Sequence, residues 1–206
     1  MTSLYDRWIL PKILRCACSA PQITKQREKV VPQAEGRVLE LGIGMGLNLA
    51  FYDAAKVSSV TGVDPSPELR AIAQQAEHDP RIRVQVDDGT AESLPFEDRS
   101  FDSVVCTFTL CSVCTPAAAL SEARRVLKPG GSFLFCEHGL APDPGIAKWQ
   151  RRLDGIWPRV FGGCHLSRPV TKAIQEAGFK LERTDSMFLP KVPGVAGWNE
   201  WGLARP

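Results

Sequence analysis

The sequence predicts a doubly wound α/β domain, with a mostly parallel, seven-stranded sheet, helices on both faces and a C-terminal antiparallel hairpin strand. Three observations support this fold class. Short apolar runs alternate with helical patterns along most of the chain, as in a parallel sheet with crossover helices. A glycine-rich turn follows the first apolar run. The length, 206 residues, suits one domain with a sizeable core.

The composition excludes several classes of protein. The 25 basic and 23 acidic residues give a net charge of +2, and no run of five basic residues occurs, so we expect no nucleic-acid partner. Seven cysteines scattered through apolar segments indicate reduced thiols and a cytoplasmic location, and Cys111-x-x-Cys114 lacks the second pair of a zinc site, so we expect no metal. Without an apolar run of about 18 residues or a signal peptide, we expect no transmembrane segment.

The first element is an irregular amphipathic stretch, residues 1–35, which we interpret as a helical lid or cap over the site. Apolar side chains follow one side of a helix that we expect to break at Pro11. Packing of this helix on the core, without a lid function, is the simpler alternative. Contact with a membrane surface through Trp8, Lys12 and Arg15 is a third possibility.

Residues 36–206 are predicted to form the main domain, and its first strand ends in a glycine-rich loop. Residues 38–41 are a buried strand, and a helical pattern begins at Leu47. A second strand, 57–63, leads to Asp64, at the position where an acid usually holds a ribose diol. The glycines between strand and helix let the backbone pass close to a ligand, and they are Gly42, Gly44 and Gly46.

Two ligands suit such a loop, a dinucleotide and S-adenosylmethionine. A dinucleotide loop has the pattern G-x-G-x-x-G, whereas here Gly46 comes one residue early. Glu40, at the end of the strand, suits a ligand that carries a cation and is unfavourable to a pyrophosphate. S-adenosylmethionine is the better fit, because it carries an adenosine, a ribose diol, an ammonium and a sulfonium.

The next elements continue the alternation. Ser66 caps a helix that begins at Pro67 and is expected to reach Glu77. Strands at 82–86, 100–106 and 132–138 are separated by a polar loop and by a helix from Pro116 to Leu127. An insertion over about 142–168 contains a helix at 146–160, and a further helix at 170–177 precedes the last strands, 179–184 and 198–204.

Three motifs resemble those of the class I S-adenosylmethionine-dependent methyltransferases. They are ELGIGMG at 40–46, A-E-x-L-P-F at 91–96, and L-K-P-G-G at 127–131. In many relatives an aspartate stands in the place of Thr90. The resemblance covers about residues 36–138 and implies that S-adenosylmethionine is the cofactor and S-adenosylhomocysteine the product. The residues implied to hold it are Glu40, Gly42, Gly44, Gly46, Asn48, Asp64, Pro65, Thr90, Ala91, Glu92 and Thr107.

Further segments resemble the small-thiol S-methyltransferases related to the mammalian membrane-associated alkyl thiol methyltransferases. They are 105–113, the pair Glu137-His138, and G-C-x-L-S-R at 163–168. The resemblance implies methyl transfer to a small apolar acceptor, most simply a thiol. The alternative within enzymes is N- or O-methylation of a phospholipid, a quinone or another small metabolite. A protein that holds the cofactor without transferring its methyl group also stays open.

His138 and His165 are the candidate general bases, although a thiolate is nucleophilic enough to make a base optional. Hydrogen bonding to a loop for His138, and a helix cap or surface role for His165, are the structural alternatives. The candidate acceptor-binding residues, which are equally typical of core packing, are Trp8, Cys111, Trp149 and Cys164.

Overall fold

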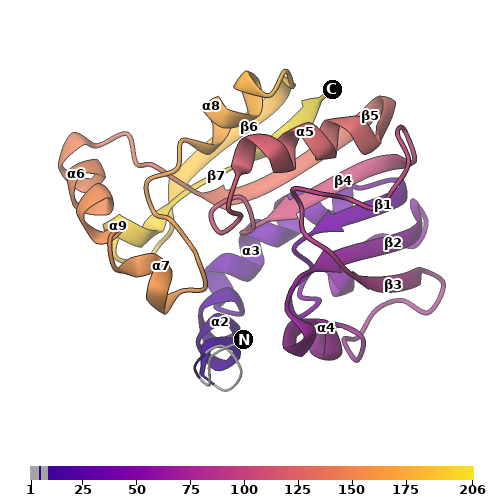
Figure 1. Cartoon of the computed structure of the whole chain (residues 1–206), viewed down its shortest axis with the longest axis horizontal. Coiled ribbons are helices and arrows are strands. Elements are labelled where there is room, and N and C mark those ends of the chain that lie inside the picture. Colours follow the sequence, from indigo (N-terminus) through magenta and orange to yellow (C-terminus); the bar gives the residue numbers. More distant parts are fainter. Residues whose placement is uncertain (1–4, 6–8) are drawn as a thin grey trace.

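The computed structural model describes residue 5 and residues 9–206, and its centre is a seven-stranded sheet of order β3-β2-β1-β4-β5-β7-β6 (Figure 1). Neighbouring strands from β3 to β5 run parallel, whereas β7 is antiparallel to both β5 and β6. The predicted fold class is therefore confirmed. The strands are β1 Gly36–Leu41, β2 Val57–Asp64, β3 Arg83–Asp88, β4 Phe101–Thr107, β5 Leu127–His138, β6 Lys180–Phe188 and β7 Trp198–Arg205.

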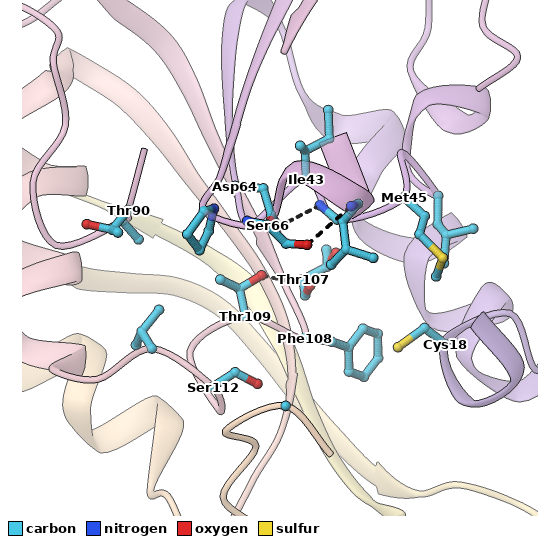
Figure 2. A pocket seen from close by; sticks show the side chains of 18 of the residues that line it. Cys18, Ile43, Met45, Asp64, Ser66, Thr90, Thr107, Phe108, Thr109 and Ser112 are labelled. Carbon is cyan, nitrogen blue, oxygen red and sulfur yellow. Dashed lines mark hydrogen bonds between the residues drawn. The ribbon is translucent and has the colours of Figure 1, made fainter. Parts of the chain in front are cut away.

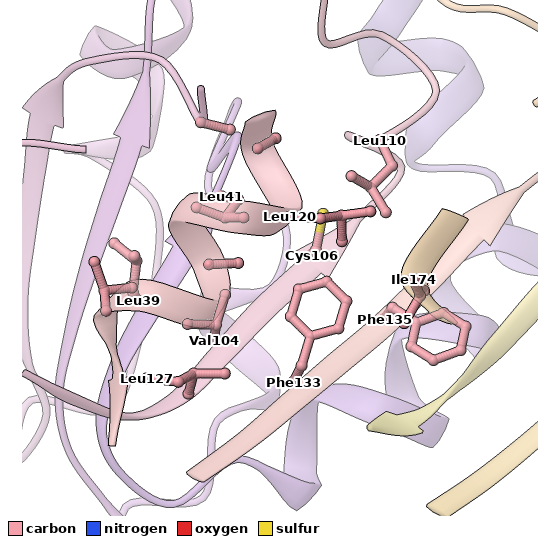
Figure 3. Close-up of a cluster of buried hydrophobic side chains, with 14 of the residues drawn as sticks. Leu39, Leu41, Val104, Cys106, Leu110, Leu120, Leu127, Phe133, Phe135 and Ile174 are labelled. Carbon is pink, nitrogen blue, oxygen red and sulfur yellow. The ribbon is translucent and has the colours of Figure 1, made fainter. Parts of the chain in front are cut away.

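Helices cover both faces of the sheet, as predicted. The helices are α2 Leu10–Cys18, α3 Pro21–Val30, α4 Pro67–Ala73, α5 Pro116–Val126, α6 Pro144–Leu153, α7 Trp157–Val160, α8 Val170–Glu176 and α9 Gly194–Gly197, with 3₁₀ turns η1 Val31–Gln33 and η2 Leu49–Phe51. One core cluster joins α5 and α8 to the sheet (Figure 3), and the other joins α3 and α4 to the opposite face. Because both faces are buried, β4 and β5 are apolar without alternation: Val104 packs on one side and Val105 on the other.

The order of the strands reverses between β1 and β4. From β1 the chain moves outward through β2 and β3, and it then returns to the other side of β1 as β4. In doubly wound sheets the loops that leave two such strands diverge and open a crevice at their carboxyl ends. The fold therefore positions a ligand site at the ends of β1, β2 and β4.

Three helix boundaries differ from the predicted ones. The helix expected from Leu47 is only the turn η2, because Tyr52 is extended and its hydroxyl donates a hydrogen bond to Glu40. Helix α4 ends at Ala73 instead of Glu77, and the chain continues in tighter i→i+3 turns. The helix expected at 146–160 is divided into α6 and α7, because Gly155 follows the end of α6 and Pro158, in the first turn of α7, has no N–H to continue the helical hydrogen bonds.

The N-terminal stretch forms two helices over the described residues. Pro11 lies in the first turn of α2, where its missing N–H costs nothing, and Pro21 begins α3. Val30 and Val31, at the end of this stretch, belong to the core cluster that also contains Leu134. Trp8 lies outside the described residues. Over residue 5 and residues 9–206, no helix has both the length and the apolar character needed to cross a bilayer.

Candidate functional site

A pocket of about 400 Å³ lies at the carboxyl ends of β1, β2 and β4, where the strand order reverses. Its walls come from the glycine loop, the loops after β2, β3 and β4, the helices α2 and α3, and Gly162. The lining residues are Leu10, Pro11, Cys18, Arg27, Gly42, Ile43, Gly44, Met45, Leu47, Asp64, Pro65, Ser66, Pro67, Glu68, Leu69, Thr90, Ala91, Glu92, Thr107, Phe108, Thr109, Ser112, Val113, Cys114 and Gly162.

The glycine loop presents bare backbone to this pocket. Gly42 and Gly44 have φ angles of +63° and +56°, a conformation that side chains rarely adopt. A Cβ on Gly42 would lie 2.6 Å from the Thr109 side chain, whereas one on Gly44 would meet only the carbonyl of Gly42, at 3.8 Å. The space beside Gly44 is therefore open to a ligand, and a side chain at this position would fill it. A Cβ on Gly46 would lie 2.8 Å from the Ala76 side chain, so this glycine is needed for packing, and its contact with the cofactor stays a prediction.

Asp64 connects the end of β2 to the glycine loop. One carboxylate oxygen accepts a hydrogen bond from the Gly44 amide at 3.0 Å, and the other accepts one from the Ser66 amide at 2.9 Å (Figure 2). Burial raises the pKa of Asp64, and these two amides partly offset the rise. A carboxylate has about four acceptor sites, so two remain for the hydroxyls of a ribose in the pocket.

The loop after β3 brings Thr90, Ala91 and Glu92 to the pocket, on the opposite side from Cys18 (Figure 2). Glu92 also accepts hydrogen bonds from the amides of Cys114 and Thr115, at 2.7 and 3.3 Å. These bonds tie the loop after β3 to the start of α5. Both loops are therefore held in one position at this end of the pocket.

Glu40 and Asn48 lie behind the pocket wall rather than on it. The Glu40 carboxylate is 2% exposed and accepts hydrogen bonds from Asn48 Nδ2 at 2.9 Å and from the Tyr52 hydroxyl at 2.7 Å. Burial raises its pKa from 4.5 to about 7, although both hydrogen bonds and the charge of Arg27 oppose that rise. This geometry suits a residue that braces the glycine loop from below.

Arg27 is a site residue that the sequence analysis did not identify. Its guanidinium is buried, lines the pocket, and donates from Nη1 to Asn48 Oδ1 at 2.8 Å and to Thr107 Oγ1 at 2.7 Å. Its Nε is buried without a hydrogen-bond partner. An unpaired buried donor on a cation is costly, so an anionic group of a ligand is favourable beside this guanidinium. In the sequence Arg27 stands in a polar helix, QITKQREK, that gives no sign of burial.

Several predicted catalytic and acceptor-binding residues do not line the pocket. His138 and Cys164 form a pair, with Nε2 2.8 Å from Sγ, and Cys111 lies next to them. Ser112 and Gly162, which are close to Cys111 and Cys164 in sequence, do line the pocket.

His165 and Trp149 are further from the site. The imidazole of His165 is 3.9 Å from the Asp154 carboxylate, and its backbone amide bonds to the carbonyl of Cys111. Trp149 is 56% exposed on α6, with the guanidinium of Arg152 over its ring. The roles that the sequence suggested for these side chains stay predictions.

Comparisons with known proteins show the family to which the chain belongs. A family model described as a methyltransferase domain matches residues 39–135. Thiol S-methyltransferase TMT1B of Rattus norvegicus is 39% identical over 173 residues, which cover 79% of this chain and 70% of that protein. Thiol S-methyltransferase TMT1A of Homo sapiens is 35% identical over 182 residues, covering 85% and 69%. Demethylmenaquinone methyltransferase of Chlorobaculum parvum is 32% identical over 174 residues, covering 76% and 70%.

Solved structures with low sequence identity share the fold. An S-adenosylmethionine-dependent methyltransferase from Mesorhizobium loti has a TM-score of 0.68 at 22% identity, covering 91% of this chain and 99% of that chain. A geranyl diphosphate methyltransferase in complex with S-adenosylmethionine has a TM-score of 0.66 at 13% identity, covering 88% and 84%. At these identities the likeness extends to the fold alone.

Proposed function

Since this chain belongs to the S-adenosylmethionine-dependent methyltransferase family, we propose that its methyl acceptor is a small apolar thiol. The similarity to thiol S-methyltransferases over about four fifths of the chain carries this proposal. The products are then a methyl thioether and S-adenosylhomocysteine. The cofactor itself follows from the family.

The residues present fit this cofactor. The open space beside Gly44 admits backbone contact, and the free acceptor sites of Asp64 suit the ribose hydroxyls. Thr90, Ala91 and Glu92 are proposed to flank the adenine. The Arg27 guanidinium, which lines the pocket, suits the carboxylate of the methionyl group, because a buried guanidinium is a strong carboxylate partner. Glu40 and Asn48 act through Arg27 and the loop, as positioning residues.

S-adenosylmethionine supplies a methyl group on a sulfonium, which is already a good leaving group. The protein has to align the acceptor with this methyl group and exclude water. The thiol of the acceptor loses its proton to solvent, and a pair of electrons on the thiolate sulfur forms the new S–C bond as the old one breaks. A positive potential lowers the pKa of a thiol, and the sulfonium beside the acceptor provides one. A dedicated base is therefore not needed.

The size and lining of the pocket favour a small apolar acceptor. Its volume, about 400 Å³, is near the lower end of the roughly 300–1,000 Å³ typical of small-molecule sites, and it has to hold the cofactor as well. The side near α2 carries Leu10, Pro11, Phe108 and Val113, which are apolar. A short alkyl or aryl thiol fits such a space.

Methylation of a quinone is the second candidate, because a demethylmenaquinone methyltransferase is also similar over about three quarters of the chain. A quinone of this kind receives the methyl group on carbon or on oxygen. Activation of such an acceptor needs a base. Among residues that line the pocket, the carboxylates of Asp64 and Glu92 accept hydrogen bonds from backbone amides, and the carboxylate of Glu68 accepts one from the Ser66 hydroxyl. This arrangement favours the thiol.

The test is an acceptor panel with isotopically labelled S-adenosylmethionine and mass spectrometry of the products. The panel contains small alkyl and aryl thiols, their alcohol and phenol counterparts, amines, phospholipids and a demethylated quinone. We expect methyl thioethers from the thiols and at least about 100-fold less product from the matched oxygen acceptors. Product from the quinone or a lipid alone would refute the thiol proposal, and no product from any acceptor would favour a binding protein.

Two further points belong to this proposal. We propose that α2 and α3 act as the cap predicted for residues 1–35, because Leu10, Pro11, Cys18 and Arg27 line the pocket.

We also propose a cytoplasmic site of action, for which the free state of all seven cysteines is the supporting observation. Contact with a membrane surface stays a prediction.

A further inference from the structure

Three metal-ligating side chains converge beside the pocket from three separate segments. Cys111 lies in the loop after β4, His138 ends β5, and Cys164 lies in the insertion between α7 and α8. Their two sulfurs and the imidazole nitrogen all lie within 4.8 Å of one another. Among the residues that the structure describes, no other three histidine, cysteine or acidic side chains approach in this way.

Hydrogen bonds do not satisfy all the polar atoms of these three side chains. The Nδ1 of His138 is buried without a partner, and its Nε2 lies 2.8 Å from the Cys164 sulfur. Cys111 is 2% exposed, and its sulfur lies beside His138 and Cys164, 3.5 Å from the Phe108 carbonyl and 3.4 Å from the Ser112 hydroxyl. Two thiols and an imidazole pointing at one place are the donor set that soft divalent cations prefer.

We propose that Cys111, His138 and Cys164 bind one zinc-like divalent cation. Bond lengths of about 2.3 Å to sulfur and about 2.0 Å to nitrogen place tetrahedral ligand atoms roughly 3.5–3.8 Å apart. The observed cluster reaches this arrangement if the His138 nitrogen and the Cys164 sulfur move apart from 2.8 Å and the other ligand atoms, which lie within 4.8 Å of one another, adjust by about 1 Å or less. Two thiolates and a neutral imidazole around a divalent cation carry no net charge, which suits a largely buried place.

Glu137 supports the position of the first ligand. Its carboxylate, which is fully buried, accepts hydrogen bonds from the amides of Thr109 and Leu110 at 2.7 and 3.0 Å, and a longer one from Cys111 at 3.4 Å. The loop that carries Cys111 is therefore fixed before any ion arrives. Such support of a ligand from behind is usual at metal sites.

The ion would join three segments that shape the acceptor side of the pocket. Ser112 is adjacent to Cys111 and Gly162 is two residues before Cys164, and both line the pocket. Three protein ligands leave one coordination position for a water molecule or a small exogenous ligand. A nitrogen of the His138 imidazole that binds the metal no longer accepts protons. If the metal is bound, His138 therefore cannot act as a general base with that nitrogen.

The test is a titration of the metal-free full chain with Co²⁺, in a phosphine reductant that keeps the thiols reduced. We expect one equivalent to give the intense visible bands of tetrahedral cobalt and a near-ultraviolet thiolate-to-cobalt band, both removed by Zn²⁺. Cys111→Ser, Cys164→Ser and His138→Ala should each weaken binding by at least about 10–100-fold. Cys16→Ser, which changes an exposed thiol on α2, is the matched control and should bind as the wild type does.

A second measurement keeps the test independent of folding defects and of the methyl acceptor. Zn²⁺ in large excess over its dissociation constant should raise the Tm of the wild type by roughly 5–10 °C, and of Cys16→Ser equally. The Cys111→Ser and Cys164→Ser variants should keep wild-type affinity for S-adenosylhomocysteine, which shows that they fold. Absence of the cobalt bands, equal bands in Cys164→Ser, or a Cys111–Cys164 disulfide in protein isolated under reducing conditions would overturn the proposal.

Discussion

The two sides of the pocket are built by different means. On the cofactor side the glycine loop, Asp64 and the loop after β3 lie at the ends of three adjacent strands, and much of the surface is backbone. On the acceptor side the wall is assembled from side chains of α2, α3 and the loop after β4, together with the backbone of Gly162 in the insertion. The hydrogen bond from Arg27 to Thr107 spans 80 residues of sequence. Local chain geometry therefore fixes one side, and long-range packing fixes the other.

The largest effect is expected from Asp64→Ala, on the cofactor side. The substitution removes the proposed ribose contacts and leaves the Gly44 and Ser66 amides without their acceptor. Two charge-assisted hydrogen bonds correspond to roughly 100- to 1,000-fold in affinity. Calorimetric titration with S-adenosylhomocysteine measures this loss directly.

Asp88→Ala is the matched control for this change. Asp88 is the partner of Asp64 in the register of β2 and β3, but its side chain is 76% exposed and pairs with Arg70 outside the pocket. Its removal should alter the affinity by less than about twofold, since exposed ion pairs contribute little. Equal affinities for wild type and Asp64→Ala would show that the ribose is held elsewhere.

This difference between the two sides also decides what the sequence reveals. Gly42, Gly44 and Asp64 have a recognisable spacing because each acts at the end of a strand, so all three could be placed before the structure was known. Arg27 left no such signal, because its burial depends on Asn48 and Thr107 in other elements. The meeting of His138 with Cys164 was equally hidden, because the path of the insertion depends on packing that no local pattern records.

The same limit applies to the fold. The mostly parallel sheet, its C-terminal hairpin strand and both covered faces followed from the alternation of apolar runs. The break between α6 and α7 was missed, although Gly155 and Pro158 inside the expected helix are local signals for it. Sequence patterns thus predicted which elements exist better than where each one ends.

The second prediction concerns the buried carboxylate between the two sides. Glu40 has a pKa of about 7 in the fold against an ordinary value of 4.5, so the folded protein binds more protons than the unfolded chain between these pH values. The contribution of Glu40 to the free energy of unfolding should therefore fall as pH rises from about 4.5 to 7, by about 3 kcal/mol in total. Urea unfolding between pH 4.5 and 8 measures it.

Glu40→Gln isolates this contribution. Glutamine keeps the shape and one acceptor oxygen but does not titrate, so the variant should lack the part of the pH dependence that belongs to Glu40. The difference in unfolding free energy between variant and wild type should shift in favour of the variant as pH rises. Parallel curves for the two proteins would mean that Glu40 is ionised throughout.

A smaller effect, roughly 10- to 100-fold, is expected from Arg27→Met, which tests the contact between the two sides of the pocket. If Arg27 holds the methionyl carboxylate, this substitution weakens S-adenosylhomocysteine binding by the value of one charge-assisted contact. Binding of 5′-methylthioadenosine, which lacks the amino-acid part, should change by less than about threefold. Calorimetry with both ligands gives the two values.

Two variants control for charge and folding. Lys25→Met removes an exposed cation from the same helix and should leave both affinities unchanged. Arg27→Lys keeps a cation but not the planar donor group, and should recover only part of the affinity. Equal losses for both ligands in Arg27→Met would indicate that Arg27 supports the pocket as a whole.

The smallest effect is expected from Trp149→Ala, because the sequence marks this tryptophan as an acceptor residue while the fold places it on the outer face of α6. With 56% of its surface exposed and only the Arg152 guanidinium stacked on it, its removal should change stability by about 0.5 kcal/mol or less and the acceptor KM by less than about twofold. Phe108→Leu, within the pocket wall, should raise that KM several-fold with the same acceptor. Initial rates over a range of thiol concentrations compare the two variants. A larger effect of Trp149→Ala than of Phe108→Leu would mean that the acceptor side extends beyond the pocket to α6. The insertion would then have to rearrange on binding to bring α6 to the acceptor.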